Sequence, residues 1–209
     1  MGVVREGKAF TTIGTSGVVF AHTDAPIIDK SGRVHTFCCA VPGKWHVMGV
    51  TQGAGLSLQW FKKQFCLEET NKAEEENCSA YDVMTAEADK IPVGCDRLLY
   101  LPYLMGERSP HNDVNARGCF IGFSFDTKRK HMTLAVMEGV AFALRDCIEV
   151  AKLESLKITS TRICGGGARS AVWRKIIANV LGVPVSVLSV EEGPAFGAAI
   201  LAMVGGGEY

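Results

Sequence analysis

The second half of the chain alternates helical and extended segments, and this alternation limits the possible folds more than any other feature. Apolar residues recur every three or four positions from Met132 to Ala151, which predicts one long amphipathic helix. Strands are expected at 161–164 and 185–188, with further helices at 172–181 and 195–204. Crossovers of this kind join parallel strands and place helices on both faces of a sheet.

The first half begins with strands that we expect to pair antiparallel. Residues 9–13 and 18–22 flank the tight turn Gly14-Thr15-Ser16-Gly17, which is typical of a hairpin. Further strands are expected at 34–41 and 45–50, before a helix that begins near Leu56. The sequence therefore predicts an α/β protein with a mixed sheet flanked by helices on both faces. This is the element order of one lobe of the actin-like (ribonuclease H-like) ATPase fold.

Residues 66–96 interrupt that order, and we interpret them as an insertion in a single domain that spans 1–209. The charged stretch 68–76 has no apolar stripe, so we expect a solvated loop or a helix end there, and no binding site. A short helix is expected at 81–90 and a strand at 97–103.

The overall charge excludes several classes of partner. Lys and Arg together number 22, as do Asp and Glu, so the net charge is zero. Such a chain does not recruit nucleic acid or an anionic membrane through its bulk electrostatics. The first six residues contain no apolar core of a secretory signal, and no uncharged stretch is long enough to span a bilayer. We expect a cytoplasmic protein that binds neither nucleic acid nor membrane.

The eight cysteines show no CxxC spacing and do not pair with histidines at the spacing of zinc ligands. We expect them to be small buried hydrophobic residues in a reducing compartment.

Two glycine-bearing turns carry the chemistry, and we expect them to come together in the folded lobe as two walls of one cleft. The hairpin turn at 14–17 offers backbone N–H groups and two hydroxyls, a donor surface suited to phosphate oxygens, although many ordinary hairpins have a similar sequence. Gly165, Gly166 and Gly167 link a strand to a helix for which Ser170 is the expected N-cap. The second turn is not GxGxxG, which disfavours a dinucleotide.

Two other segments have structural interpretations when taken alone. Small residues around Gly193–Ala199 are expected to let the last helix pack tightly against a neighbour, with Pro194 in its first turn. Glu107 and Arg108 lie side by side in a loop bounded by Gly and Pro, where their side chains could pair and fix the loop.

The order of these segments closely resembles the C-terminal half of the FGGY carbohydrate kinases over nearly the whole chain. The segments are GTSG, HTFCCAVPGKWHVMG, PYLMGERSPHND, the stretch 118–139, ICGGGARSAVW and EEGPAFGAAI. Phe123 departs from the family pattern, which usually has a smaller aliphatic residue there. Within the family the chain is most similar to xylulokinases.

The resemblance implies a fold of two lobes that bind ATP and a sugar in the cleft between them. By this resemblance, Gly14, Thr15 and Ser16 would face the phosphates of ATP or ADP. Other implied nucleotide-binding residues are Gly55, Gln59, Gly166, Gly167 and Ala171. Ala171 stands where related glycerol kinases have an Asn near the adenine, so that hydrogen bond is not expected here. Mg²⁺ is the metal that phosphoryl transfer of this kind usually uses.

The resemblance also implies a general base, which is an Asp in a Gly-Gly-Asp-Asn-like segment shortly before the GTSG hairpin. Nothing in residues 1–13 is similar to that segment, so we expect this Asp to lie upstream of Met1 in the parent enzyme. We therefore expect no catalytic residue in this chain and no turnover by it alone. Asp24, Asp29 and Asp113 are expected to be solvated surface carboxylates.

The parent enzyme would phosphorylate D-xylulose to the 5-phosphate, bind the sugar largely through the other lobe, and form a homodimer. Another sugar of the family, such as gluconate or glycerol, remains an alternative. So does a non-catalytic actin-like nucleotide-binding module.

Overall fold

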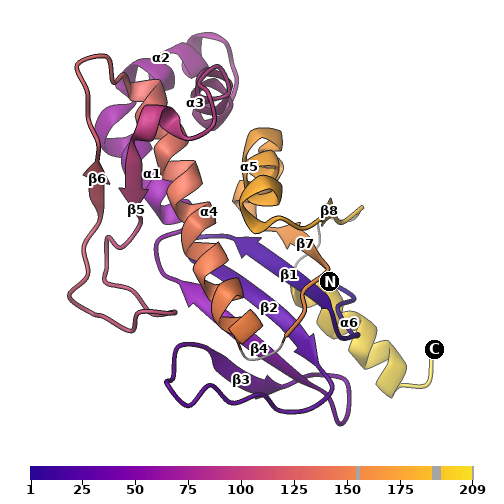
Figure 1. Cartoon of the computed structure of the whole chain (residues 1–209). Helices are drawn as coiled ribbons and strands as arrows, with labels where there is room; N and C mark the ends of the chain where they lie inside the picture. The colour runs from indigo at the N-terminus through magenta and orange to yellow at the C-terminus, as the bar shows by residue number, and fades with distance from the viewer. Residues whose placement is uncertain (154–155, 190–193, 209) are drawn as a thin grey trace.

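A computed structural model of the chain describes residues 1–153, 156–189 and 194–208. Its main feature is a six-stranded sheet in the order β3-β4-β2-β1-β7-β8 (Figure 1). The strands are β1 Lys8–Ile13, β2 Gly17–Thr23, β3 His35–Cys38, β4 Trp45–Thr51, β7 Ser160–Cys164 and β8 Val185–Val187. β1, β7 and β8 run parallel, whereas β1–β2, β2–β4 and β3–β4 pair antiparallel. The predicted mixed sheet is confirmed.

The alternation of side chains gives the sheet one buried face. In β1, Ala9 and Ile13 are buried, whereas Phe10 on the opposite face is half-buried. The long helix α4 (Arg129–Leu153) crosses the buried face, and its apolar residues form the centre of the core (Figure 1). The amphipathic pattern thus predicted both this helix and the side of it that packs against the sheet.

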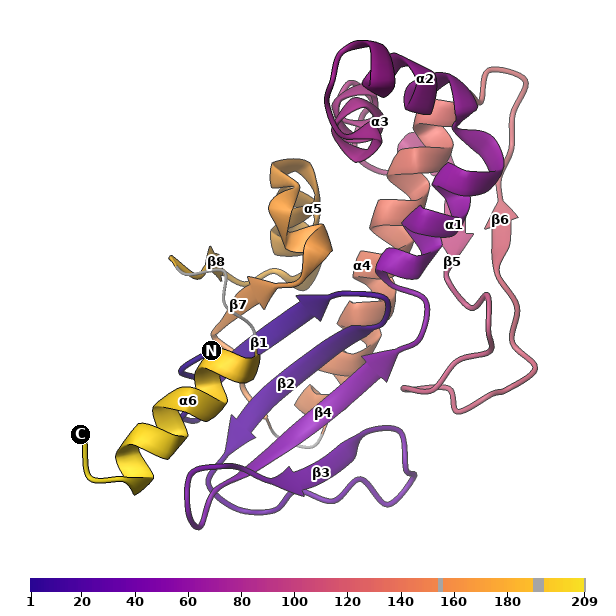
Figure 2. The ribbon, with the colours of Figure 1, turned by 180° about the vertical axis from the view of Figure 1, so that it is seen from behind.

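Helices lie on both sides of the sheet. Helix α5 (Ala171–Leu181) packs beside α4, and α6 (Pro194–Gly205) lies on the opposite side of the sheet (Figure 2). The N-terminal end of α4 meets helices α1 (Gly55–Phe65), α2 (Leu67–Glu75) and α3 (Ala80–Ala88). A two-stranded ribbon, β5 (Leu99–Leu101) with β6 (Cys119–Ile121), completes this end (Figure 1). Short 3-10 turns occur at Cys95–Arg97 and Gly166–Arg169.

The expectation of a loop or a helix end at 68–76 is wrong, because α2 is a regular helix. Ala73 is its only buried residue. Glu68 and Glu69 occupy the first turn, where the helix dipole favours negative charge, and both carboxylates pair with Arg129 of α4. Ion pairs to a neighbouring helix therefore hold α2 in place of an apolar stripe. The prediction failed because it relied on such a stripe to recognise a helix.

The expectation that α6 packs tightly is also wrong. A Cβ on Gly197 would meet nothing within 4 Å, and Phe196 and Leu201 are 48% and 51% exposed. The helix extends away from the sheet (Figure 2), and a Cβ on Gly205 would likewise meet nothing within 4 Å. Glu191–Gly193, the start of this motif, lie outside the described residues.

Burial corrects two further expectations. Cys66, Cys95 and Cys147 are buried as expected, but Cys38, Cys78 and Cys119 are exposed, and all eight thiols are free. Cys38 and Cys119 occupy outward positions of strands β3 and β6, which explains their exposure. Asp29 is buried rather than solvated, because it accepts hydrogen bonds from the backbone and guanidinium of Arg33.

Candidate functional site

Three turns meet at one edge of the sheet. β1 and β7 are parallel, and Thr12 pairs with Cys164, so the turns that follow these two strands leave the sheet side by side. Gly17, the first residue of β2, pairs with Thr51, the last residue of β4. The turn from β4 to α1 therefore begins at the same edge. In open α/β sheets, ligands bind at the carboxyl ends of the strands, and this edge is of that kind.

The GTSG hairpin is attached directly to the start of α1. The carbonyl of Gly14 accepts a hydrogen bond from the N–H of Gly55 at 2.7 Å, and the carbonyl of Thr15 accepts from Ala54 at 3.1 Å and from Leu56 at 3.2 Å. These N–H groups have no partner within the helix, so the hairpin carbonyls satisfy them. A side chain on Gly55 would overlap with the Gly14 carbonyl oxygen, which explains why glycine is needed there.

The glycine triplet packs against the same hairpin. Gly165 has a φ of +91°, and a Cβ on it would lie 2.6 Å from the carbonyl oxygen of Ile13. A Cβ on Gly167 would overlap with the Ile13 side chain, whereas one on Gly166 would meet nothing within 4 Å. Two of the three glycines are therefore required by contacts within the protein, and Gly166 leaves an open, exposed backbone surface. The two predicted glycine turns are adjacent.

The remaining predicted residues extend this edge outward. Thr15, Gln59, Gly166 and Ala171 are exposed, and Gly14, Ser16, Gly55 and Gly167 are half-buried. The structure brings the hairpin, Gly55 and the triplet into contact, while Gln59 and Ala171 lie on the solvent sides of α1 and α5. The predicted N-cap is confirmed, since the Ser170 hydroxyl accepts a hydrogen bond from the N–H of Trp173 at 3.2 Å. An assembly of exposed N–H groups and hydroxyls can bind an anion such as a phosphate.

Arg174 fixes the triplet turn from α5, and the sequence analysis missed it. Its guanidinium donates to the carbonyl of Ala168 at 2.6 Å and to that of Arg169 at 2.8 Å. The sequence signal that could have identified this residue is an arginine one turn into the helix that follows a run of glycines.

Glu107 behaves differently from the expectation, in which its side chain would pair with that of Arg108. It is 2% exposed, and its carboxylate accepts hydrogen bonds from the Thr51 hydroxyl and from the N–H groups of Gln52 and Arg108. A surface ion pair is therefore the wrong description. The segment folds back against the end of β4, where the N–H of Ser109 donates to the carbonyl of Val50 at 2.9 Å.

The three Asp residues weighed as general bases are engaged elsewhere. Asp24 follows β2 at the opposite edge of the sheet and pairs with Lys44 at 2.6 Å. The Arg33 side chain beside Asp29 holds the pKa of that carboxyl far below its usual range, which leaves it a poor proton acceptor. Asp113 accepts a hydrogen bond from the N–H of Asn115 at 2.8 Å within its own exposed loop.

The N-terminal residues do not place a carboxylate at the glycine turns. Met1 lies against β7, where its carbonyl accepts a hydrogen bond from the Arg162 guanidinium. Glu6 is the one carboxylate among residues 1–13, and it is exposed just before β1, at the sheet edge opposite the glycine turns. It is therefore too far away to serve as the base. The expectation of a general-base Asp upstream of Met1 stays a prediction.

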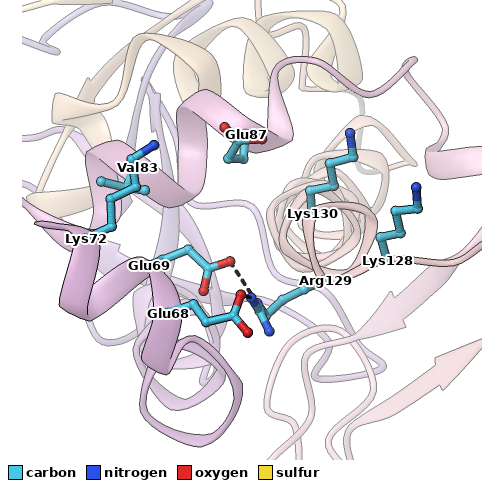
Figure 3. Close-up of a pocket in the computed structure, with 8 residues that line it drawn as sticks. All are labelled: Glu68, Glu69, Lys72, Val83, Glu87, Lys128, Arg129 and Lys130. Carbon is cyan, nitrogen blue, oxygen red and sulfur yellow. Dashed lines mark hydrogen bonds and ion pairs between the residues drawn. The ribbon is translucent and has the colours of Figure 1, made fainter.

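A mixed-charge cavity of about 390 Å³ lies far from the glycine turns, between α2, α3 and the start of α4 (Figure 3). The Arg129 guanidinium reaches across it to Glu69, with an Nε to Oε1 distance of 2.7 Å. Its lining residues are Glu68, Glu69, Lys72, Val83, Glu87, Lys128, Arg129 and Lys130. Because acidic and basic side chains both line it, the cavity offers no single sign of charge to a ligand.

Neither metal clusters nor membrane helices are found in the described part of the chain. Within residues 1–153, 156–189 and 194–208, no three His, Cys, Asp or Glu side chains are arranged to hold a metal ion. Across the same ranges, no helix has both the length and the apolar character needed to cross a bilayer.

The sheet order and the three turns at its carboxyl edge define a lobe of the actin-like ATPase fold. Residues 9–206 match the profile described as "FGGY family of carbohydrate kinases, C-terminal domain". The chain therefore belongs to the FGGY family of carbohydrate kinases.

Relatives of known activity agree with this membership. The chain is 37% identical over 208 residues to a xylulose kinase from Bacillus subtilis, and the match covers all of the chain and 40% of the relative. It is 35% identical over 213 residues to a gluconokinase from the same organism, covering 98% of the chain and 40% of the relative. A solved structure described as a "xyloylose kinase" from Brucella ovis superposes with a TM-score of 0.85 at 38% identity, covering 98% of the chain and 40% of that structure. The chain thus spans about 40% of the length of these relatives.

Proposed function

We propose that this chain supplies one wall of the nucleotide site of an ATP-dependent sugar kinase. The observation that carries the proposal is the direct contact among the GTSG hairpin, the start of α1 and the glycine triplet at the carboxyl edge of the sheet. The exposed Thr15 hydroxyl and the half-buried Ser16 hydroxyl are suited to phosphate oxygens, and the open backbone at Gly166 is suited to a flat group. ATP and ADP are the proposed ligands.

Mg²⁺ would be held mainly by the nucleotide. This ion usually binds phosphate oxygens, several waters and one or two carboxylates. The wall described here presents hydroxyls and backbone groups, so it fits the phosphates rather than the metal. When bound, Mg²⁺ supplies neutralisation of the charge on the transferred phosphoryl group.

D-xylulose is the proposed sugar. The identity to a xylulose kinase over the full chain supports this choice. Because a gluconokinase is almost as similar, gluconate is the second candidate. The sugar would bind mostly outside the residues described here, and a homodimer remains a prediction.

We further propose that the chain alone binds nucleotide without transferring phosphate. A sugar hydroxyl needs a positioned base to take its proton, and Asp24, Asp29 and Asp113 are each engaged in other interactions. The purified chain is titrated with ADP by calorimetry, and ADP release from Mg-ATP is then assayed with xylulose, gluconate and glycerol in turn. We expect binding of ADP and no release with any sugar.

Each arm of this experiment decides a different question. Absence of ADP binding would refute the nucleotide site. Sugar-dependent ADP release would refute the lack of turnover, and the sugar that promotes it would identify the substrate. Nucleotide-dependent polymers, detected by light scattering, would favour the non-catalytic actin-like module instead.

A further inference from the structure

Glu107 is a buried carboxylate for which the nucleotide wall itself gives no role. It lies in the long connection between β5 and β6, more than fifty residues beyond β4 in sequence, and is 2% exposed. Its carboxylate accepts hydrogen bonds from the Thr51 hydroxyl at 2.5 Å, from the N–H of Gln52 at 3.0 Å and from the N–H of Arg108 at 2.6 Å. Three hydrogen bonds to one buried carboxylate leave little freedom to the groups that donate them. Two of the three donors, Thr51 and Gln52, lie at the end of β4.

The end of β4 leads into the β4–α1 turn, which is hydrogen-bonded to the GTSG hairpin. Immediately after Gln52, the N–H groups of Ala54, Gly55 and Leu56 bind the carbonyls of Gly14 and Thr15. A continuous path of contacts therefore runs from the Glu107 carboxylate, through the β4–α1 turn, to the GTSG backbone.

The same connection holds the turn at a second point. A Cβ on Gly53 would overlap with the carbonyl oxygen of Pro102, so the backbones of these two residues are in close contact. The Ser57 hydroxyl donates to the carbonyl of Gly53 from the first turn of α1. The β4–α1 turn is thus held between Pro102 on one side and Glu107 on the other.

We propose that Glu107 is a positioning residue for the nucleotide site: it fixes the β4–α1 turn, and through it the Gly14–Ser16 hairpin, in the conformation that binds phosphate. The proposal rests on the proposed function, because it assigns to Glu107 an effect on nucleotide affinity. Glu107 itself does not touch the nucleotide. Its carboxylate accepts hydrogen bonds from the buried Thr51 hydroxyl and from two backbone N–H groups, and so removes alternative conformations of the turn.

The chain provides a matched control in Glu138. This carboxylate is also buried, at 5% exposed, and accepts a hydrogen bond from a backbone N–H, that of Gly94 at 2.9 Å. It holds the segment before β5 and makes no contact with the β4–α1 turn among those described here. Both carboxylates can be replaced by Gln, which has nearly the same shape. Comparison of the two variants shows whether an effect on the site is specific to Glu107 or follows from replacing any buried carboxylate.

The test is ADP affinity, measured by calorimetry on the full chain, for Glu107→Ala, Glu107→Gln, Thr51→Val and Glu138→Gln. We expect Glu107→Ala to weaken ADP binding about tenfold, which is the change in affinity that corresponds to the net contribution of about one hydrogen bond. Glu107→Gln should retain affinity within about threefold, since an amide oxygen can still accept from Gln52 and Arg108. Thr51→Val should give an intermediate loss, and Glu138→Gln should give none.

Backbone amide NMR provides a readout that general destabilisation would not move. We expect the amide signals of Gly14 and Gly55 to shift or broaden in Glu107→Ala and to stay in place in Glu138→Gln. If Glu107→Ala does not fold, Thr51→Val, which removes the hydroxyl that donates to the Glu107 carboxylate, is compared with Glu138→Gln in its place.

Two results would overturn the positioning role: normal ADP affinity with unmoved Gly14 and Gly55 signals in Glu107→Ala, or in Thr51→Val if Glu107→Ala does not fold, and an affinity loss in Glu138→Gln equal to that in Glu107→Ala or, if that variant does not fold, to that in Thr51→Val. Failure of the unsubstituted chain to bind ADP is a different outcome, because it would refute the proposed function itself.

Discussion

The carboxyl edge of the sheet and the contact between α2 and α4, which we call the charged layer, are held together by different forces. At the edge, backbone packs directly against backbone, as where the N–H of Gly55 binds the Gly14 carbonyl at 2.7 Å. Between α2 and α4, long charged side chains make the contact, as where Arg129 pairs with Glu68 and Glu69. Steric exclusion at Gly55, Gly165 and Gly167 allows almost no alternative residue, whereas exposed ion pairs tolerate many. Substitutions at these close backbone contacts should therefore have large effects on stability, and substitutions at the ion pairs should have small ones.

The largest effect is expected from Gly55→Ala. The new Cβ would overlap with the Gly14 carbonyl oxygen, so either the hairpin or the start of α1 must move. Overpacking of this kind usually costs about 1–3 kcal/mol of unfolding free energy. Because the displaced atoms belong to the proposed phosphate hairpin, ADP affinity should fall as well. Urea unfolding and ADP calorimetry measure the two effects.

Gly32→Ala is the control for glycine replacement in general. A Cβ there meets nothing within 4 Å, although its φ of +68° makes the substitution mildly unfavourable. It should lower stability without changing ADP affinity. Equal loss of ADP affinity in the two variants would show that the close contact at Gly55 is not what matters.

The same difference explains what the sequence could predict. The hairpin, the long helix α4, the Ser170 cap and the adjacency of the two glycine turns follow from periodicity, turn chemistry and the rule for parallel crossovers. Helix α2 was missed because its stabilising partner, Arg129, lies about sixty residues away in sequence. The role of Glu107 was missed for the same reason, since Thr51 and Gln52 are its partners only in the folded chain. Local patterns carry no information about such long-range polar contacts.

An intermediate effect is expected from Glu138, a buried carboxylate of α4 that accepts a hydrogen bond from the N–H of Gly94. Burial raises its pKa above the ordinary value of 4.5. Between that value and the raised one, the folded chain binds more protons than the unfolded chain, so Glu138 makes the unfolding free energy fall as pH rises. Glu138→Gln should remove this fall and gain stability relative to the parent at neutral pH, by on the order of 1 kcal/mol.

Urea unfolding of both proteins from pH 4 to pH 8 provides the measurement. The difference in unfolding free energy should grow with pH and then level off. A difference that is constant across this range would mean that the carboxyl of Glu138 titrates alike in the folded and unfolded chains.

A smaller effect is expected from Arg129→Ala in the charged layer. The guanidinium is 33% exposed and Glu68 is 81% exposed, so solvent screens much of their attraction. Pairs of this kind contribute about 0–1 kcal/mol, and salt reduces the contribution further. We expect a loss of less than 1 kcal/mol that shrinks in high salt, with ADP affinity unchanged. A salt-independent loss of several kcal/mol would show that α2 depends on this contact far more than its exposure indicates.

The smallest effect on stability, and the most informative one for the site, is expected from Gly166→Ala. A Cβ at this position meets nothing within 4 Å, so the unfolding free energy should stay within about 0.5 kcal/mol of the parent value. The added methyl group would nevertheless occupy the open surface that we assign to the nucleotide. ADP affinity should therefore fall several-fold while stability is retained. A variant at Gly55 cannot separate the effect on affinity from the effect on stability in this way. If calorimetry instead shows unchanged ADP affinity, the nucleotide does not lie on Gly166, and the glycine triplet serves only to pack against Ile13.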